Sequence, residues 1–98
     1  MEFERTVDGD VAYLALKGLC DSEGRDERLE RIVDEWGEAG VGGAVLNLSQ
    51  LQFASSEGIA IFLWLYGTAG RKGVRVVYSD VPRLIASMMQ AMGLDQMF

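Results

Sequence analysis

Residues 44–78 read AVLNLSQLQFASSEGIAIFLWLYGTAGRKGVRVVY, and this stretch carries the patterns of a strand, a helix and a second strand. The apolar run at 44–48 and the β-branched run at 74–78 have the length and composition of buried strands. Residues 59–66 between them are too long and too apolar a run for a solvent-facing strand, and they favour a helix. A strand, a crossover helix and a strand predict parallel neighbouring strands.

The N-terminal part predicts a hairpin followed by a helix. Residues 3–7 and 11–17 are β-prone and are separated by Asp8-Gly9-Asp10, a tight-turn sequence in which glycine accepts a positive φ. Apolar residues then recur at helical spacing among acidic ones, which predicts an amphipathic helix that ends near Gly37. These apolar residues are Leu29, Ile32, Val33 and Trp36.

The C-terminal part predicts a last helix. Asp80 is placed to cap it, Pro82 suits its first turn, and Gly93 suits a left-handed C-cap. The resulting order, ββαβαβα, predicts an α/β fold with a mixed sheet of four to five strands and helices packed on it. The length of 98 residues suits one domain, over residues 1–98.

Composition excludes several function classes. The net charge of −6 weighs against nucleic-acid binding, which needs clustered Lys and Arg, and favours a protein partner of basic or mixed charge. With no histidine and one cysteine, Cys20, neither a Cys/His metal site nor a histidine general base can be built, and no cofactor motif is present. No run reaches the length of a membrane span or resembles a signal peptide, so we expect a cytoplasmic protein without direct membrane insertion.

The 59–66 helix has two apolar faces. Ile59, Phe62, Leu63 and Tyr66 form one stripe, and Ile61, Trp64, Leu65 and Thr68 form another. One stripe must cover the sheet, and the second is either buried under neighbouring helices or offered to a partner. Base rates for apolar side chains favour burial, with partner contact through Trp64 as the alternative.

The turn before this helix is Ser55-Ser56-Glu57-Gly58. On spacing alone, either serine is best explained as the helix N-cap, and Glu57 as an acid that suits a first helical turn.

Three segments, in this order, resemble the STAS domain of bacterial anti-sigma factor antagonists. Residues 46–59 resemble the family's aliphatic strand, aromatic residue, Asp-Ser-Ser-Gly or Ser-Ser-Ala-Gly motif and apolar helix. Gly18-Leu19-Cys20-Asp21 resembles the Gly-Glu-Leu-Asp that follows the second strand, and residues 93–98 resemble the Gly-Leu-Asp ending with its phenylalanine. Asn47 stands at the family's strand aspartate, and Ser55 where many members have aspartate.

The resemblance implies a protein-binding switch and not an enzyme. Family antagonists bind an anti-sigma factor that is also an ATP-dependent serine kinase, and so free a sigma factor for transcription. Phosphorylation of one serine breaks the complex, and a phosphatase restores it. That serine falls on Ser56, which makes this chain an expected phosphoprotein. The partner-binding residues expected are Asp21, Ser55, Ser56, Glu57, Gly58 and Trp64.

The resemblance is also compatible with other functions found among STAS-like domains. STAS-like domains also serve as small soluble subunits of lipid-transport ABC systems, as components of larger signalling assemblies, and in nucleotide binding. The sequence stops at Phe98, where many members continue with another strand and helix, so we expect an exposed edge strand open to pairing, with either a homodimer or a missing partner surface as the consequence.

Overall fold

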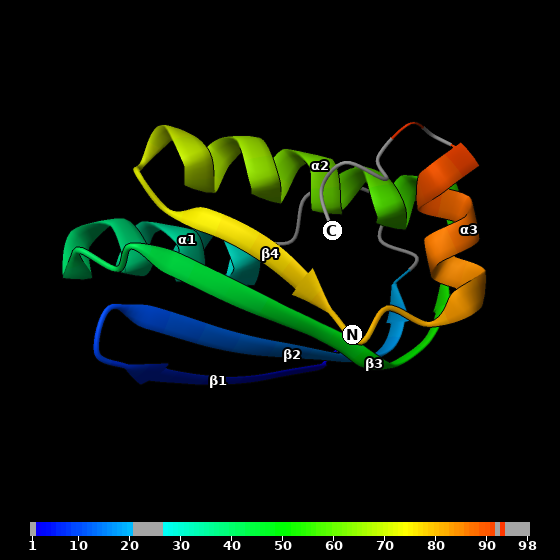
Figure 1. Ribbon diagram of the computed structural model, residues 1–98, viewed down its shortest axis with the longest axis horizontal. Helices are drawn as coiled ribbons and strands as arrows, with labels where there is room; N and C mark the ends of the chain where they lie inside the picture. Colours follow the sequence, from blue (N-terminus) through cyan, green and yellow to red (C-terminus); the bar gives the residue numbers. More distant parts are fainter. Residues whose placement is uncertain (1, 21–26, 92, 94–98) are drawn as a thin grey trace.

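The strands and helices follow one another in the predicted order, ββαβαβα (Figure 1). The structure is a computed structural model that describes residues 2–20, 27–91 and 93. The strands are β1 (Glu2–Asp8), β2 (Val11–Cys20), β3 (Gly43–Ala54) and β4 (Arg75–Ser79). The helices are α1 (Glu27–Ala39), α2 (Ser56–Arg71) and α3 (Arg83–Ala91).

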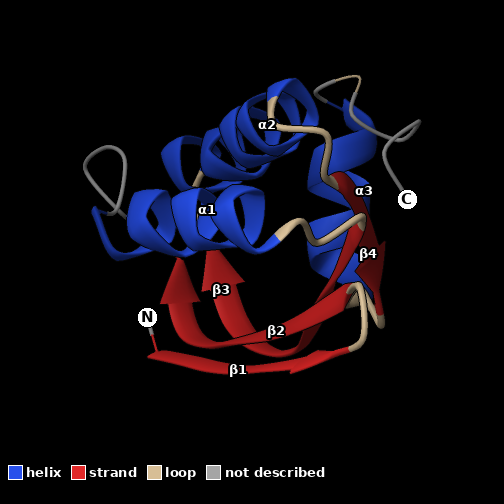
Figure 2. Ribbon diagram, turned by 90° about the vertical axis from the view of Figure 1, so that its left-hand side faces the viewer, coloured by secondary structure: helices blue, strands red, loops and turns tan. Residues whose placement is uncertain are grey.

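The sheet is mixed and has the strand order β1-β2-β3-β4. The predicted hairpin joins β1 to β2 in antiparallel pairing, with Gly9 at a φ of 65° in its turn. The two crossover helices make β2, β3 and β4 parallel to one another. Figure 2 shows α1 and α2 above the same face of the sheet. The α/β fold predicted from the sequence is therefore confirmed, with four strands among the described residues.

The core lies between that face and the helices. Strand residues of alternating position point into it, because side chains of a strand alternate between its two faces. The fully buried large side chains include Leu14, Leu16, Leu46, Leu48, Phe62 and Leu65. Of the expected apolar residues of α1, all four are buried, whereas in α3 Ile85 and Met89 are buried and Leu84 is exposed.

The central strands run farther than the sequence predicts. β2 continues past Lys17 to Cys20, and β3 continues past Leu48 to Ala54. Their pairing shifts register between Ala15 and Lys17 and again between Gly18 and Leu19, and Gly18 has a φ of 90°. The ladder resumes after each of these β-bulge-like irregularities, so residues 49–54 continue β3.

Helix α1 also passes its predicted end at Gly37 and continues to Ala39, where Gly40 at a φ of 71° follows it. A glycine within a helix costs only about 1 kcal/mol, which tertiary contacts can offset. Here the missing side chain leaves room for Lys72, whose Cδ would lie 3.2 Å from a Cβ at Gly37. Lys72 Nζ in turn pairs with Asp34 at 3.0 Å.

The expected cap of α3 by Asp80 is wrong. The helix begins at Arg83, and the amide of Ala86 donates to the carbonyl of Pro82, so Asp80 lies too far upstream. Asp80 has a φ of 53°, a conformation that aspartate tolerates better than most residues. Gly93 does have the predicted left-handed conformation, with a φ of 78°. The expected contact of Leu94 with Met89 lies outside the described residues.

Tyr78 links the sheet to α2, because its hydroxyl donates to the carbonyl oxygen of Phe62 at 2.7 Å inside the core. Burial, with a smaller effect from Tyr66, raises the pKa of this phenol above its usual range. We expect Tyr78→Phe to lower the free energy of unfolding by about 1 kcal/mol at neutral pH, the net value of one hydrogen bond.

The stability that the Tyr78 hydroxyl contributes depends on pH. A raised pKa in the folded state means that the folded protein holds the phenolic proton more tightly than the unfolded chain does. Stability is therefore retained below the unfolded pKa of about 10 and falls as the pH rises above it. Denaturant unfolding between neutral pH and pH 11 should show the wild type losing its advantage over Tyr78→Phe; a constant difference would contradict this assignment.

Candidate functional site

Ser55 is the N-cap of α2. Its backbone is extended, with φ and ψ of −81° and 172°, and its Oγ accepts a hydrogen bond from the amide of Gly58 at 3.0 Å. Its carbonyl accepts the first helical hydrogen bond, from Ile59, at 2.9 Å. One of the unpaired amide groups at the start of the helix is thereby satisfied.

Ser56 is the first residue of the helix itself, one position later than the loop in which the sequence places it. Glu57 and Gly58 follow it in the first turn, and Gly58 is buried. The capping role that the sequence leaves open between two serines therefore belongs to Ser55. Ser56 stands beside the amide groups and the positive end of the helix dipole.

The end of β2 lies next to this helix start. Cys20 pairs with Ala54 in the parallel ladder, and Ala54 directly precedes the Ser55 cap. Neighbouring strands are about 4.8 Å apart, so the chain leaves β2 within reach of the first turn of α2. Asp21, the next residue and an expected partner contact, lies outside the described residues.

Trp64 lies away from the start of α2. It is two turns along α2, about 12 Å from Ser56 at 1.5 Å per residue. Its ring is partly buried against the core and lines a groove of 540 Å³ between α1 and α2. The other residues of this α1–α2 groove are Glu30, Asp34, Thr68, Arg71 and Lys72.

The buried and exposed residues of α2 do not follow the two apolar stripes predicted from the sequence. Ile59 and Phe62 are buried with Ile61 and Leu65, whereas Leu63 and Tyr66 are 50% and 43% exposed. The buried arc therefore contains parts of both stripes, and the exposed side belongs to the stripe without Trp64. The α1–α2 groove itself was missed, because its charges come from two helices whose relative position no single-helix pattern reveals.

Asn47 takes part in a polar cluster at the end of β4. Its Nδ2 donates to Asp80 Oδ2 at 3.2 Å, and its Oδ1 accepts from the amide of Ser49 at 2.8 Å. An amide can donate and accept at once, whereas an ionised aspartate here could only accept and would face Asp80 as a like charge. Asparagine at this position is thus explained by its neighbour, which the parallel register between β3 and β4 brings close.

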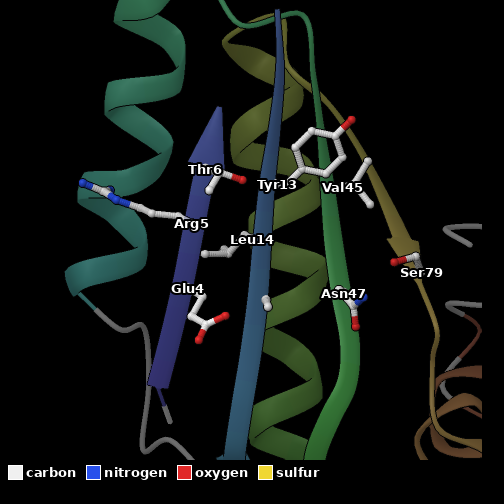
Figure 3. Close-up of a pocket in the computed structure, with 9 residues that line it drawn as sticks. Glu4, Arg5, Thr6, Tyr13, Leu14, Val45, Asn47 and Ser79 are labelled. Atoms are coloured by element: carbon white, nitrogen blue, oxygen red, sulfur yellow. The ribbon is translucent and has the colours of Figure 1, made fainter. Parts of the chain in front are cut away.

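This cluster borders the uncovered face of the sheet. Figure 3 shows Asn47, Ser79, Val45 and Tyr13 on that face, where they line a hollow of 610 Å³. Within the described part of the chain, no group of three or more acidic or cysteine side chains is placed to hold a metal ion. None of the described helices combines the length and the hydropathy that crossing a bilayer requires.

The Ser55 cap is expected to contribute to the stability of the fold. We expect Ser55→Ala to lower the free energy of unfolding by about 1 kcal/mol, because the Gly58 amide loses its acceptor. Ser55→Asp is the matched control, since its carboxylate can accept the same hydrogen bond and favours the helix dipole. Denaturant unfolding of both variants checks this, and equal losses would mean that the Ser55 side chain does not cap the helix.

Comparison with known proteins supports the fold and gives the family. Two structures of SpoIIAA, a Bacillus anti-sigma factor antagonist, are similar to this chain, one of the unphosphorylated form and one of the phosphorylated form. The TM-scores are 0.72 and 0.69 at 18% and 17% identity, over 98% of this chain and 84% and 87% of those chains. An anti-sigma factor antagonist from Mycobacterium paratuberculosis is similar at TM-score 0.73 and 21% identity, over 99% of this chain and 81% of that one.

No curated protein sequence matches the chain. A sequence profile of the STAS_2 family, described as "Mlab, STAS domain", matches residues 4–98, nearly the whole sequence. The profile therefore covers the strands, the helices and the Ser55 cap described above, and the chain belongs to the STAS_2 family of STAS domains.

Proposed function

We propose that this chain is a protein-binding switch of the anti-sigma factor antagonist type. In this proposal, residues 1–98 form one STAS module that binds an anti-sigma factor with serine-kinase activity and thereby regulates transcription. Phosphorylation at Ser56 releases the partner, and a phosphatase restores binding. The observation that carries the proposal is the position of Ser56 as the first residue of α2, directly after a serine that caps the helix.

The helix start can accept a phosphate without loss of the fold. Phosphorylation adds roughly two negative charges and strong hydrogen-bond acceptors. At Ser56 these charges would stand beside the first-turn amides and the positive end of the α2 dipole, where anions are favoured. Because Ser55 supplies the cap, modification of Ser56 leaves the Ser55–Gly58 hydrogen bond available.

The same phosphate would act on the partner. A partner surface that fits a neutral serine next to Glu57 would meet a cluster of negative charge and would lose affinity through repulsion or an unpaired buried charge. Similarity to SpoIIAA in both phosphorylation states, at nearly equal TM-scores, supports a switch that works without refolding.

The binding surface in this proposal is the start of α2 with the adjoining end of β2. It comprises Asp21, Ser55, Ser56, Glu57 and Gly58, with Trp64 as a further contact two turns along α2, in the α1–α2 groove. The net charge of −6 favours a partner of basic or mixed charge and disfavours nucleic acid. We propose a binding role and no catalytic one, with action in the cytoplasm.

A second candidate is supported by the family description, which names Mlab. In this alternative the chain is the small STAS subunit of a lipid-transport ABC system, where it supports the ATPase and needs no phosphorylation. The start of α2 would then be a permanent contact, and Ser56 a first-turn residue without modification.

Calorimetric titration distinguishes the two candidates. The chain is titrated separately with the anti-sigma-type kinase and with the transport ATPase encoded nearest to its gene. The switch proposal expects saturable binding to the kinase that disappears after preincubation with ATP. Binding to the ATPase alone, unchanged by ATP treatment of the chain, would reject the switch in favour of the transport subunit.

A further inference from the structure

We infer that the face of the sheet opposite α1 and α2 is a second docking surface, which fits a helix of a partner protein with an apolar stripe flanked by lysine or arginine. This inference goes beyond the proposed function and does not depend on it. Figure 2 shows α1 and α2 on one side of the sheet, and the other side is called the open sheet face here.

The open sheet face has an apolar centre. Alternate residues of β2, β3 and β4 are buried in the core, so Tyr13, Val45 and Val77 between them point to the open sheet face. These three residues are in register, because Tyr13 pairs with Val45, and Val45 pairs with Val77. Tyr13 and Val77 are 45% and 41% exposed. They therefore form one apolar row across three strands.

The parallel direction of these strands favours a second covering layer. Parallel strands are ordinarily covered on both faces of their sheet, whereas an antiparallel sheet can leave one face in water. β2, β3 and β4 are parallel, and α1 and α2 cover one face of them. A helix of a partner on the open sheet face would complete the arrangement that parallel strands usually have.

The apolar row has the width of one helix. Neighbouring strands are about 4.8 Å apart, so the row from β2 to β4 spans about 10 Å, the diameter of a helix with its side chains. The hollow of 610 Å³ lies beside this row and is lined by Tyr13, Val45 and the small side chain of Ala15 (Figure 3). A large apolar side chain of a docked helix fits into this hollow.

The charges around the row select a basic helix. β1 places Glu2, Glu4 and Asp8 on the open sheet face, because their partners on β2 point to it. Glu4 is paired with Lys17, whereas Glu2 and Asp8 have no ion pair within the described part of the chain. Lysine or arginine beside the apolar stripe of a helix can pair with these carboxylates, and an acidic helix would be repelled.

The first test uses a synthetic peptide of leucine and lysine whose leucines form one helical stripe. A length of about 16 residues allows the peptide to be helical. Nuclear magnetic resonance of the isotope-labelled full chain should show the largest amide shifts at Tyr13, Val45 and Val77, with a dissociation constant below about 1 mM. No saturable binding, or largest shifts on α1 or α2, would overturn the inference. Concentration-dependent shifts on the open sheet face without peptide would do so too, since a second copy would then be the occupant.

The same peptide with glutamate in place of lysine tests the charge selection. It keeps the apolar stripe but would face the carboxylates of β1, so we expect its dissociation constant to be at least about tenfold higher at low salt. Added salt should reduce the difference, because it screens exposed charges. Equal binding of the two peptides would overturn the assignment of a basic partner.

The second test changes the apolar row itself. Tyr13→Lys should raise the dissociation constant of the leucine–lysine peptide at least about tenfold, because it replaces an apolar contact by a like charge. Leu63→Lys is the matched control, since Leu63 is 50% exposed but lies on α2, and it should bind within about twofold of the wild type. Circular dichroism should show that both variants are folded. Equal weakening by the two substitutions would overturn the inference.

A third variant separates this surface from the proposed switch. Ser56→Asp changes the charge at the start of α2, on the covered side of the sheet, and should leave binding of the leucine–lysine peptide within about twofold of the wild type. Binding that changes as strongly in Ser56→Asp as in Tyr13→Lys would overturn the independence of the two surfaces. The result with the kinase partner does not affect this outcome, so the two proposals can fail separately.

Discussion

Ser56→Asp is expected to weaken binding of the kinase partner by about 100-fold or more, which corresponds to about 2.7 kcal/mol. The physical reason is the charge that the substitution places at the start of α2, where the proposed partner contacts a neutral serine. Ser56→Ala should bind as the unmodified chain does and should no longer respond to ATP. Calorimetric titration of both variants with the kinase measures the difference.

The control for this prediction is Ser55→Asp, which adds the same charge one residue earlier. Many members of the family carry aspartate at this position, so we expect binding within about tenfold of the wild type, or 1.4 kcal/mol. Circular dichroism should show that all three variants are folded. Equal loss of binding in Ser55→Asp and Ser56→Asp would indicate a general charge effect and remove the specific role of Ser56.

Phe62→Ala is expected to lower the free energy of unfolding by about 3–5 kcal/mol, which is a large part of the stability of a domain of this size. Phe62 is 0% exposed, and its ring lies 5.6 Å from that of Tyr78 between centroids. Removing it leaves a cavity between α2 and β4 that the surrounding side chains cannot fill completely. Urea unfolding monitored by circular dichroism measures the loss.

Leu63→Ala is the matched control, because Leu63 is the next residue of the same helix and is half exposed. We expect it to cost less than about 1 kcal/mol. Similar costs at the two positions would mean that α2 is rotated about its axis relative to the arrangement described here.

The order of elements could be predicted because each one carries its own local pattern. Alternating and continuous apolar runs distinguish strands from helices, and Asp8-Gly9 marks the hairpin without any knowledge of the rest of the chain. The element ends could not be predicted equally well. β3 reaches Ala54 because β2 continues beside it to Cys20, and α1 passes Gly37 because Lys72 packs across it.

The start of α2 could be located from the motif at residues 55–58, but the roles of its two serines could not be separated. Both are good capping residues, and which one caps depends on where the helix begins, a position uncertain by a residue or two in any sequence pattern. Contacts between helices and strands far apart in the sequence could not be predicted at all. The Asn47–Asp80 hydrogen bond and the α1–α2 groove join residues far apart in sequence, so only the fold reveals them.

The most direct test of the central claim is mass spectrometry of the intact protein and its peptides after incubation with ATP and the nearest-encoded anti-sigma-type kinase. The switch predicts a single added phosphate, located on Ser56 and absent from Ser56→Ala. An unmodified mass under conditions in which the kinase is active, or a phosphate on another residue, would contradict the switch and leave Ser56 as a first-turn residue of a binding module.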